Sequence, residues 1–477
     1  MPVLPHVSSR TCGAGLLSAR RPHTNLTGDS VSTRPEAHLI SDGDRHAIFL
    51  PDTVLAFGLD DETRAALQAG NPLPEPPEAT GTDPEACADH SCAPGHPLTS
   101  LPEDPGAASR DNCDCEDGRL NRLVLHVTHD CNLRCAYCYA DGGSYGRPRT
   151  NMPREIAATA VNWAVATFGG IRTIQFFGGE PLLNPKLIFE VCEYCKALRD
   201  EGHIDEMPRF AIVTNGVLGN DGVMEMLRRY DISATVSIDG PAQVHDALRG
   251  EGTFEAADDF ARRCLDAGDI AVDFECTYTP RHLEQGISVV DLIDFFSERY
   301  SRGVTHIAHV SAPEGGALYL PDEVKAEAYA EAARYSVRRL MEGRMRANSF
   351  SWRVMDALRT REPIAAYCPA GSGTMAVDPE GWLYPCFMFA GEDDYRVARF
   401  TEDGRAVDDR LSEVAPVVSM CDKSLHPECA SCWAAPLCSG CIGADFLSCG
   451  DATARTSCAT TKAIAEAVIL EVAGMAM

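Results

Sequence analysis

The chain has 477 residues, and 42 Lys and Arg against 70 Asp and Glu give it a formal net charge of −28. This acidity argues against nucleic acid or an anionic membrane as the main partner, because phosphate groups are bound by clustered Lys and Arg. No apolar run reaches the ~18 residues that a membrane span needs, and the first residues lack the apolar core of a signal peptide. We therefore expect a cytoplasmic protein, with about three domains for a chain of this length.

The first 118 residues divide into three segments. Residues 1–37 are rich in Ser, Arg, Pro and Gly without periodicity, which predicts a flexible leader. Residues 38–70 predict two short strands and one helix, a small β-β-α segment that is a candidate substrate-recognition element. Residues 71–118 are crowded with Pro, Gly, Asp and Glu and predict a linker. This linker contains thiols and imidazoles that could bind a metal, although their spacing matches no rigid motif and exposed linker cysteines are the favoured interpretation: Cys87, Cys92, Cys113 and Cys115, with His90 and His96.

From residue 119 to residue 315, apolar runs alternate with amphipathic stretches. Six runs predict strands, at residues 123–127, 173–177, 210–214, 234–238, 272–278 and 306–310. This alternation predicts right-handed crossovers and a parallel sheet, with active residues in the loops after the strands. The fold class is therefore α/β, a partial, TIM-like (β/α)6 barrel. A helical bridge (316–363) and a Cys-rich region (364–477) are expected to follow it.

The 21 cysteines are the unusual feature of the composition. Disulfides are rare in a reducing compartment, so clustered cysteines there indicate metal or redox chemistry. Three of them, Cys131, Cys135 and Cys138, lie in one loop directly after the first predicted barrel strand. A cubane [4Fe–4S] cluster has four ligand positions, so three thiolates would leave one iron open to another molecule. A zinc site is the alternative, but the place of the loop at the mouth of a barrel argues for an active site.

This loop, CNLRCAYCY, resembles the signature loop of the radical S-adenosylmethionine (radical SAM) enzymes, and the resemblance extends over roughly residues 120–310. In that family the open iron binds S-adenosylmethionine, whose reductive cleavage gives a 5′-deoxyadenosyl radical. The resemblance implies that Tyr137 lies against the adenine, that Glu180 accepts from the methionine ammonium group, and that Ser237 contacts the ribose. It also implies that the guanidinium of Arg249 binds the methionine carboxylate. Further cofactor-side residues are implied in the segments FFGGEPL, IVTNG and SIDG: Gly178, Gly179, Thr214, Asn215 and Asp239.

The C-terminal cysteines follow the order Cys-x12-Gly-x4-Cys and then Cys-x2-Cys-x5-Cys-x2-Cys, with a further Cys downstream. This order resembles the SPASM domain, an extension that holds two auxiliary [4Fe–4S] clusters. By that resemblance, auxiliary cluster I takes Cys368, Cys386 and Cys441, and auxiliary cluster II takes Cys429, Cys432, Cys438 and Cys458. The usual last spacing is Cys-x3-Cys, so this chain is one residue short and the ligand set is open. Cys421 and Cys449 remain as candidate fourth ligands of cluster I, and an open iron is equally compatible.

The resemblance also bears on the reaction. Sulfatase-maturing enzymes place an acidic residue after the cysteine equivalent to Cys386, where this chain has Phe387. The barrel segments look most like enzymes that form thioethers in ribosomal peptides, and like the maturation enzyme of quinohemoprotein amine dehydrogenase. We therefore expect a maturase that joins a Cys sulfur to a side-chain carbon, of Asp or Glu, in a peptide or small protein. The expected cofactors are three [4Fe–4S] clusters and S-adenosylmethionine, with flavodoxin or ferredoxin as external electron donor.

Three alternatives stay open. The chain could catalyse another peptide modification, such as sulfatase-type oxidation of Cys or Ser or a carbon–carbon crosslink. It could act chiefly as a substrate-binding module through residues 38–70. It could be an electron-carrying iron–sulfur protein, although such a protein would not need Glu180, Ser237 and Arg249 around an open iron.

Overall fold

The computed structural model describes residues 34–69, 71–72, 118–301, 305–343, 348–407 and 414–474. Most of the expected leader and nearly all of the expected linker lie outside the described residues, as do the linker's candidate metal ligands: Cys87, His90, Cys92, His96, Cys113 and Cys115. Among the helices of the described ranges, none combines the length and the apolar character that a membrane crossing requires.

The N-terminal unit contains three strands, where the sequence predicted two. Strands β1 (His38–Asp42), β2 (Arg45–Leu50) and β3 (Leu55–Leu59) form an antiparallel sheet, and helix α2 (Asp61–Gln68) follows. The first predicted strand is in fact a hairpin, because Gly43 adopts a φ of 60° and turns the chain within it.

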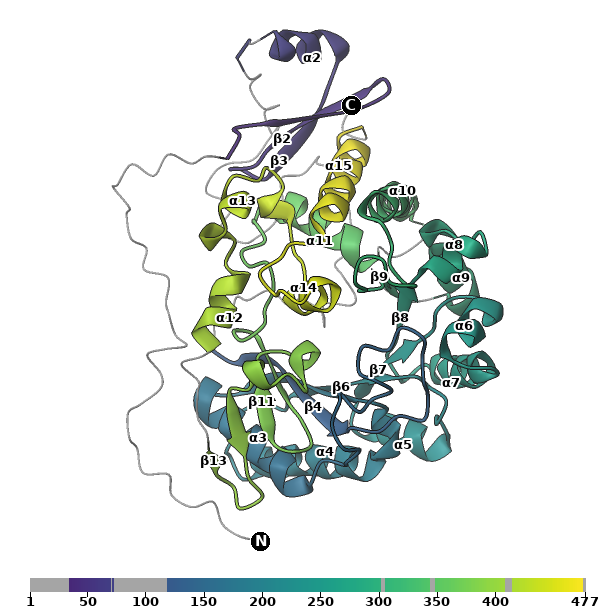
Figure 1. The fold of residues 1–477 in the computed structure, drawn as a ribbon, viewed down its shortest axis with the longest axis vertical. Helices are drawn as coiled ribbons and strands as arrows, with labels where there is room; N and C mark the ends of the chain where they lie inside the picture. The colour runs from purple at the N-terminus through teal and green to yellow at the C-terminus, as the bar shows by residue number, and fades with distance from the viewer. Residues whose placement is uncertain are drawn as a thin grey trace, which may run out of the picture.

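This unit sits at one end of the molecule, against the C-terminal helix α15 (Cys458–Gly474), as Figure 1 shows. The carboxylate of Glu471 accepts hydrogen bonds at 2.6 Å from Arg45 and 2.7 Å from Arg338 of helix α10 (Asp322–Met341). A buried carboxylate shared by two guanidiniums therefore joins the N-terminal unit to the helices that follow the barrel.

The main sheet contains the six predicted barrel strands, all parallel and paired in chain order. They are β4 (Leu120–Thr128), β5 (Ile171–Gly178), β6 (Arg209–Thr214), β7 (Ile232–Ser237), β8 (Val272–Tyr278) and β9 (Thr305–His309). Successive side chains alternate between the two faces. In β7, for example, Ala234 and Val236 are buried in the core, whereas Thr235 and Ser237 point into the cavity described below. The partial barrel is confirmed.

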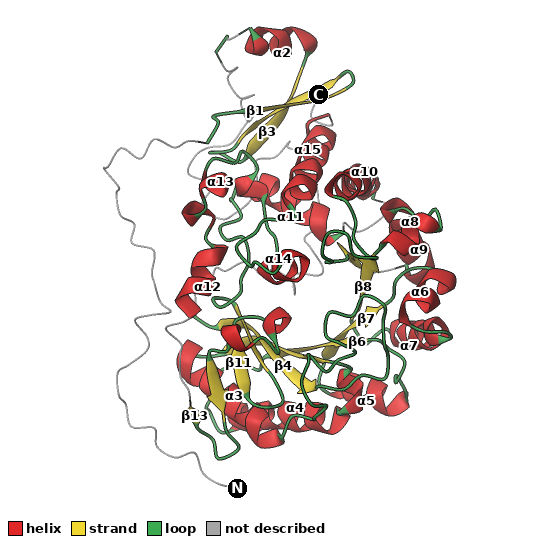
Figure 2. Ribbon diagram, viewed as in Figure 1, coloured by secondary structure: helices red, strands yellow, loops and turns green. Residues whose placement is uncertain are grey.

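Helices cover the outer face of this curved sheet (Figures 1 and 2). They are α3 (Arg154–Phe168), α4 (Pro185–Asp200), α5 (Asp221–Arg229), α6 (Ala242–Arg249), α7 (Thr253–Ala267), α8 (Pro280–Glu284) and α9 (Val289–Tyr300). The main hydrophobic core lies between these helices and the outward side chains of the strands. The inner face of the sheet is left free for a site.

The Cys-rich region is joined to the barrel by its own strand. Strand β10 (Thr374–Val377) pairs in parallel with β4, and β11 (Trp382–Tyr384), β12 (Ala398–Phe400) and β13 (Ala406–Val407) continue the sheet antiparallel. The sheet therefore extends past the first barrel strand into the cysteine-bearing segment.

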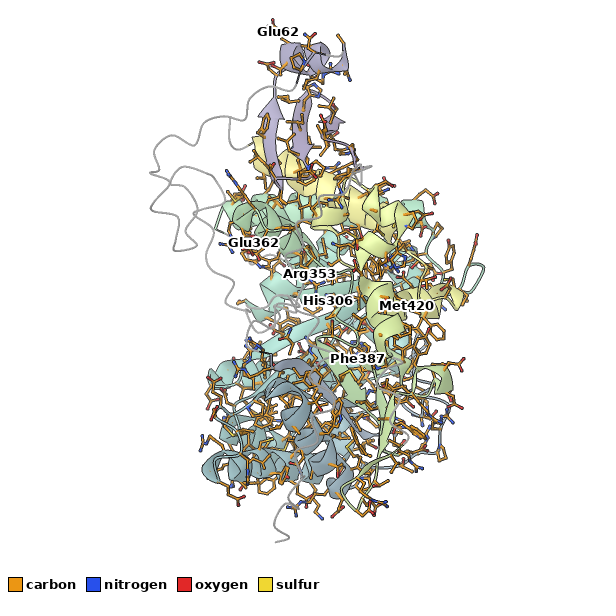
Figure 3. All side chains as sticks on the ribbon, turned by 90° about the vertical axis from the view of Figure 1, so that its left-hand side faces the viewer. Glu62, His306, Arg353, Glu362, Phe387 and Met420 are labelled. Atoms are coloured by element: carbon orange, nitrogen blue, oxygen red, sulfur yellow. The ribbon has the colours of Figure 1, made fainter. Side chains whose placement is uncertain are left out.

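The remaining elements close the open side of the barrel. They are α11 (Ser349–Thr360), η4 (Phe387–Phe389), α12 (Val414–Cys421), η7 (Lys423–Leu425), α13 (Pro427–Ala430), η8 (Ala435–Leu437) and α14 (Ile442–Cys449). Figure 3 shows His306 and Arg353 at mid-height, between the N-terminal unit marked by Glu62 and the Phe387 region below.

Candidate active site

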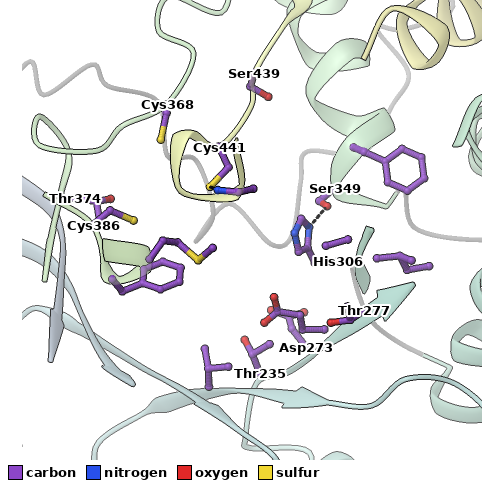
Figure 4. Close-up of a pocket in the computed structure, with 18 of the residues that line it drawn as sticks. Thr235, Asp273, Thr277, His306, Ser349, Cys368, Thr374, Cys386, Ser439 and Cys441 are labelled. Atoms are coloured by element: carbon purple, nitrogen blue, oxygen red, sulfur yellow. Dashed lines mark hydrogen bonds between the residues drawn. The ribbon is translucent and has the colours of Figure 1, made fainter. Parts of the chain in front are cut away.

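One large cavity, of about 1490 Å³, lies between the inner face of the barrel and the Cys-rich region. It is lined from both sides by thiols, those of Cys131, Cys135, Cys138, Cys368, Cys386 and Cys441. Figure 4 shows three of them, Cys368, Cys386 and Cys441, on one side and His306 with Ser349 on the other. Two cysteine fields that are more than 200 residues apart in the chain thus open into the same space.

The loop of the barrel cysteines (Cys131, Cys135 and Cys138) packs directly on the Gly-Gly-Glu segment. A Cβ atom on Gly179 would lie 2.1 Å from the carbonyl oxygen of Asp130, and one on Gly178 would lie 2.3 Å from that of Thr128. The sequence led us to expect that these glycines let the backbone approach a ligand. In the structure both line the cavity, but what their lack of a side chain permits is contact with the backbone that carries the cysteines.

The carboxylate of Glu180 joins three of the predicted cofactor-side segments. It accepts hydrogen bonds from the hydroxyl of Thr214 at 2.6 Å and from the backbone N–H of Asn215 at 2.8 Å. The side chain of Asn215 in turn donates to Asn132 in the cysteine loop at 2.9 Å. Burial raises the pKa of Glu180, and these hydrogen bonds oppose the rise. Glu180, Thr214 and Asn215 all line the cavity, so the carboxylate is held in place at its wall.

Arg249 is held by an internal carboxylate. Its Nε and Nη2 donate to the two oxygens of Asp239 at 2.7 and 3.2 Å, and the hydroxyl of Tyr137 donates to the same carboxylate at 2.6 Å. Burial alone would raise the pKa of Asp239, but the charge and hydrogen bonds of Arg249 outweigh burial and hold that pKa below its usual value. The resemblance predicted that Arg249 grips a ligand carboxylate and that Asp239 is on the cofactor side. In the structure Asp239 is fully buried and absent from the cavity wall, whereas Arg249 and Tyr137 line it.

Two cavity residues were missed from the sequence. Ser237, the last residue of β7, is the register partner of Glu275 on β8, and Glu275 is the register partner of His306 on β9. The three side chains line the cavity at one level of the barrel. Nδ1 of His306 lies 2.6 Å from the hydroxyl of Ser349 (Figure 4). The surrounding protein lowers the pKa of His306 by desolvation, while the nearby Glu275 carboxylate acts in the opposite direction. Strand alternation pointed Glu275 inward, but only the sheet register brings it beside His306.

Four thiols of the Cys-rich region converge at the cavity edge, and we call them the first auxiliary group: Cys368, Cys386, Cys421 and Cys441. The thiol of Cys368 is within hydrogen-bonding reach of those of Cys421 and Cys441, and Cys386 interacts electrostatically with Cys441. Cys421 is 3% exposed and ends α12. Cys449, the other candidate fourth ligand, is instead exposed, and its thiol donates to the backbone carbonyls of Asp445 and Asp451.

Two glycines explain how Cys441 reaches this group. A Cβ on Gly440 would lie 2.1 Å from the ring of Tyr367, which precedes Cys368, and a Cβ on Gly443 would lie 2.4 Å from Met388, which follows Cys386. The segment around Cys441 can therefore pack tightly against both neighbouring cysteine segments. Cys386 and Cys441 are the N-cap residues of η4 and α14, where backbone N–H groups stabilise a thiolate.

A second auxiliary group lies outside the cavity wall and consists of Cys429, Cys432, Cys438 and Cys458. These thiols interact electrostatically with one another, and burial raises the pKa of Cys438 to about 12. The ammonium group of Lys423 lies beside them.

The donor set fits iron–sulfur clusters. Every cysteine in the described ranges is a free thiol. Within those same ranges, no three His, Cys, Asp or Glu side chains are close enough together to hold a single metal ion, whereas a cubane cluster spreads its ligands further apart. Burial raises the pKa of Cys131 to about 11, so the empty thiols are protonated, and metal binding would release those protons.

Comparison with known proteins identifies the barrel. Residues 125–279 match the model of the radical SAM superfamily. The chain contains a radical SAM domain. The solved structure titled native anSMEcpe with bound AdoMet and Kp18Cys peptide is similar to 75% of this chain and 99% of its own, with a TM-score of 0.61 and 17% sequence identity. At that identity the likeness concerns the fold alone.

Curated relatives match mainly within the radical SAM domain. An uncharacterized protein of Methanocaldococcus jannaschii is 36% identical over 27% of this chain and 42% of its own length. The radical SAM cyclopropyl synthase TigE of Paramaledivibacter caminithermalis is 29% identical over 27% of this chain and 29% of its own. The antilisterial bacteriocin subtilosin biosynthesis protein AlbA of Bacillus subtilis is 28% identical over 28% of this chain and 27% of its own. The chain thus spans less than half the length of each of these relatives.

The barrel cysteines supply the first prediction. Changing Cys131, Cys135 and Cys138 together to Ala should remove about four iron atoms, the content of one cubane. Cleavage of S-adenosylmethionine to 5′-deoxyadenosine should be abolished, while the far-UV spectrum stays native because the loop lies at the cavity surface. Iron analysis and chromatography of anaerobically reconstituted protein measure both effects. Undiminished cleavage in this variant would contradict the assignment.

The second prediction concerns the bidentate pair at the cavity wall. Arg249→Lys keeps the charge but loses the two-point contact with Asp239, so affinity for S-adenosylmethionine should fall by about 1–3 kcal/mol. Arg299→Lys is the matched control, since Arg299 holds Asp258 by an equally bidentate contact away from the cavity. Calorimetric titration with S-adenosylmethionine measures the difference. Equal affinity in the two variants would leave Arg249 with a purely structural role.

The third prediction separates the two candidate fourth ligands. Cys421→Ala should disturb one auxiliary cluster, seen as lost iron or an altered EPR signal, because its thiol lies beside that of Cys368. Cys449→Ala should leave iron content and spectra unchanged, because its exposed thiol contacts only backbone carbonyls. The reverse pattern would reassign the ligand to Cys449, and unchanged spectra in both variants would indicate an open iron.

Proposed function

We propose that this chain is a radical SAM maturase that joins a Cys sulfur to a side-chain carbon, of Asp or Glu, within a peptide or small protein. The observation that carries the proposal is the shared cavity. The barrel cysteines and three thiols of the first auxiliary group line the same space, so a substrate there meets both. A volume of about 1490 Å³ suits a folded-in peptide segment better than a single small metabolite.

The names of similar proteins point the same way. A solved neighbour holds S-adenosylmethionine together with a Cys-containing peptide, and AlbA takes part in the biosynthesis of a bacteriocin. Three [4Fe–4S] clusters are proposed: one held by the barrel cysteines, one by the first auxiliary group and one by the second. When bound, these clusters and S-adenosylmethionine would supply a 5′-deoxyadenosyl radical in the barrel and an electron acceptor at the first auxiliary group. A small redox protein, such as flavodoxin or ferredoxin, is the proposed donor.

The balance of the reaction calls for a base. For each ring, the substrate loses one C–H hydrogen atom to 5′-deoxyadenosine, one thiol proton and one electron, and it gains one C–S bond. With Cys421 beside Cys368, the first auxiliary group has four protein ligands, which leaves no open iron to bind and acidify the substrate thiol. A side chain must therefore take the proton.

Glu275 and His306 are the proposed proton acceptors. They are adjacent in register, line the cavity, and lie level with Ser237, the proposed ribose contact. The lowered pKa of His306 keeps its imidazole neutral near pH 7, which is the form that accepts a proton. Phe387 cannot serve, because its ring lies against Phe177 at 4.7 Å and carries no titratable group. This arrangement disfavours sulfatase-type oxidation by a base after Cys386.

The N-terminal unit is the proposed substrate-recognition element. Its sheet is fixed to α15 through Arg45 and Glu471, and His38 stacks on Trp433 of the Cys-rich region at 3.8 Å. A peptide segment held by this unit would therefore be presented by a rigid mount rather than by a swinging arm.

The fourth prediction tests the reaction and its base together. Reconstituted enzyme is incubated anaerobically with dithionite, S-adenosylmethionine and a pool of synthetic peptides that each contain one Cys with Asp and Glu. A thioether product should lose the mass of two hydrogen atoms per ring and no longer react with iodoacetamide. A carbon–carbon crosslink would lose the same mass but keep its free thiol, and would contradict thioether formation.

In the same assay, Glu275→Gln should still release 5′-deoxyadenosine while crosslink yield falls by about 10²–10⁴-fold, the range of general acid–base catalysis. The radical arises at the barrel cysteines and does not depend on this carboxylate. The barrel-cysteine variant is the control that should lose both products. A normal crosslink yield in Glu275→Gln and in His306→Gln would reject these residues as proton acceptors.

A further inference from the structure

Lys423 is a buried cation in an unusual setting. It begins η7 two residues after Cys421, and 7% of its surface is exposed. Its Nζ donates to three backbone carbonyls, those of Ala435 at 2.6 Å, of Cys438 at 3.0 Å, and of Ile364. An amine that serves three acceptors uses three N–H bonds, and only the ammonium form has three.

This charge has no acidic partner among the described residues: none of their Asp or Glu side chains forms an ion pair with Lys423. The negative charge within reach is that of the second auxiliary group, since Cys438, Cys429 and Cys432 all favour the charged form of Lys423. Arg34, the other charged neighbour, is a cation and opposes it. An isolated buried charge is costly, so the site is electrically complete only when these thiols are ionised.

We propose that Lys423 is the counter-ion of the iron–sulfur centre held by the second auxiliary group and that its charge raises the reduction potential of that centre. The proposal rests on the ligand set of the proposed function. A cluster gains one negative charge on reduction, and a fixed positive charge in a low-dielectric site favours the more negative state.

The position of Lys423 gives this charge a direction. The first auxiliary group lines the cavity and the second does not. A higher potential at the outer centre draws the electron released by bond formation away from the substrate. Lys423 is a positioning residue in this scheme, because it touches no cavity atom and acts only through the centre.

The test is an anaerobic redox titration followed by EPR, in full-length reconstituted protein whose barrel cysteines are changed to Ala so that only auxiliary signals remain. Lys423→Met removes both the charge and the hydrogen bonds. Lys423→Gln removes the charge but keeps two N–H donors for the carbonyls, and Lys423→Arg keeps the charge. Lys462→Met is the matched control, because Lys462 also interacts with a thiol of this group, Cys458, but from an exposed position.

In the neutral variants we expect the reduction equilibrium of one centre to shift at least tenfold toward the oxidised form, which is about 59 mV for a one-electron couple. Lys423→Arg and Lys462→Met should stay close to the parent protein. Loss of about four iron atoms from both neutral variants, with retention in Lys423→Arg, would also support the counter-ion role, because removal of the charge alone then releases the centre.

An unchanged potential in either neutral variant that retains its iron would overturn the proposal. A shift of the same size in Lys423→Arg would also overturn it, because the charge would then not be the cause. The titration uses no peptide, so failure of the crosslinking assay leaves its result standing. A parent holding one auxiliary centre would refute the ligand set itself.

Discussion

The parallel pairing of β10 with β4 is the constraint on which the rest of the site depends. Strand β4 leads directly into the loop of the barrel cysteines, and the β10–β11 hairpin lies between Cys368 and Cys386. Ladder hydrogen bonds therefore fix the two cysteine fields relative to each other, as one sheet rather than as two domains on a linker. Reacting groups held in this way need no domain closure to meet, and that favours radical chemistry, in which a misplaced partner is quenched by another group.

Charge is distributed in the same economical way. The chain carries a net charge of −28, yet the two most deeply placed cations near the proposed cofactors are buried beside thiols or a carboxylate. Arg249 is balanced by Asp239 within the protein, so its position at the cavity wall is already set before any ligand binds. Lys423 lacks such a partner among the described residues and is balanced only when the second auxiliary thiols are ionised. One cation is thus preorganised by the fold, and the other is completed by cofactor loading.

The sequence predicted most of the fold and part of the site. All six barrel strands were visible, because each is a short apolar run that ends in a functional loop. The N-terminal hairpin was missed, since its turn rests on Gly43 alone. The contact of Arg249 with Asp239 was also missed, because spacing shows which side chains approach a site but not which of them satisfy one another. The juxtaposition of Glu275 and His306 depends on strand register, and that of Cys421 and Cys368 on packing permitted by Gly440. None of these is a local property of the chain.

The four-cysteine closure of the first auxiliary group links structure to mechanism. An open iron would let the cluster bind the substrate thiol and acidify it, and the protein would need no base nearby. A closed group leaves the thiol to the side chains of the cavity, where the Phe387 position offers none and the β8–β9 wall offers Glu275 and His306. The same closure gives the cluster a different task, because a fully ligated centre beside the substrate exchanges electrons without exchanging ligands. Proton and electron then leave the substrate on opposite sides, toward β9 and toward the Cys-rich region, so the carbon radical and the thiolate are left to combine with each other.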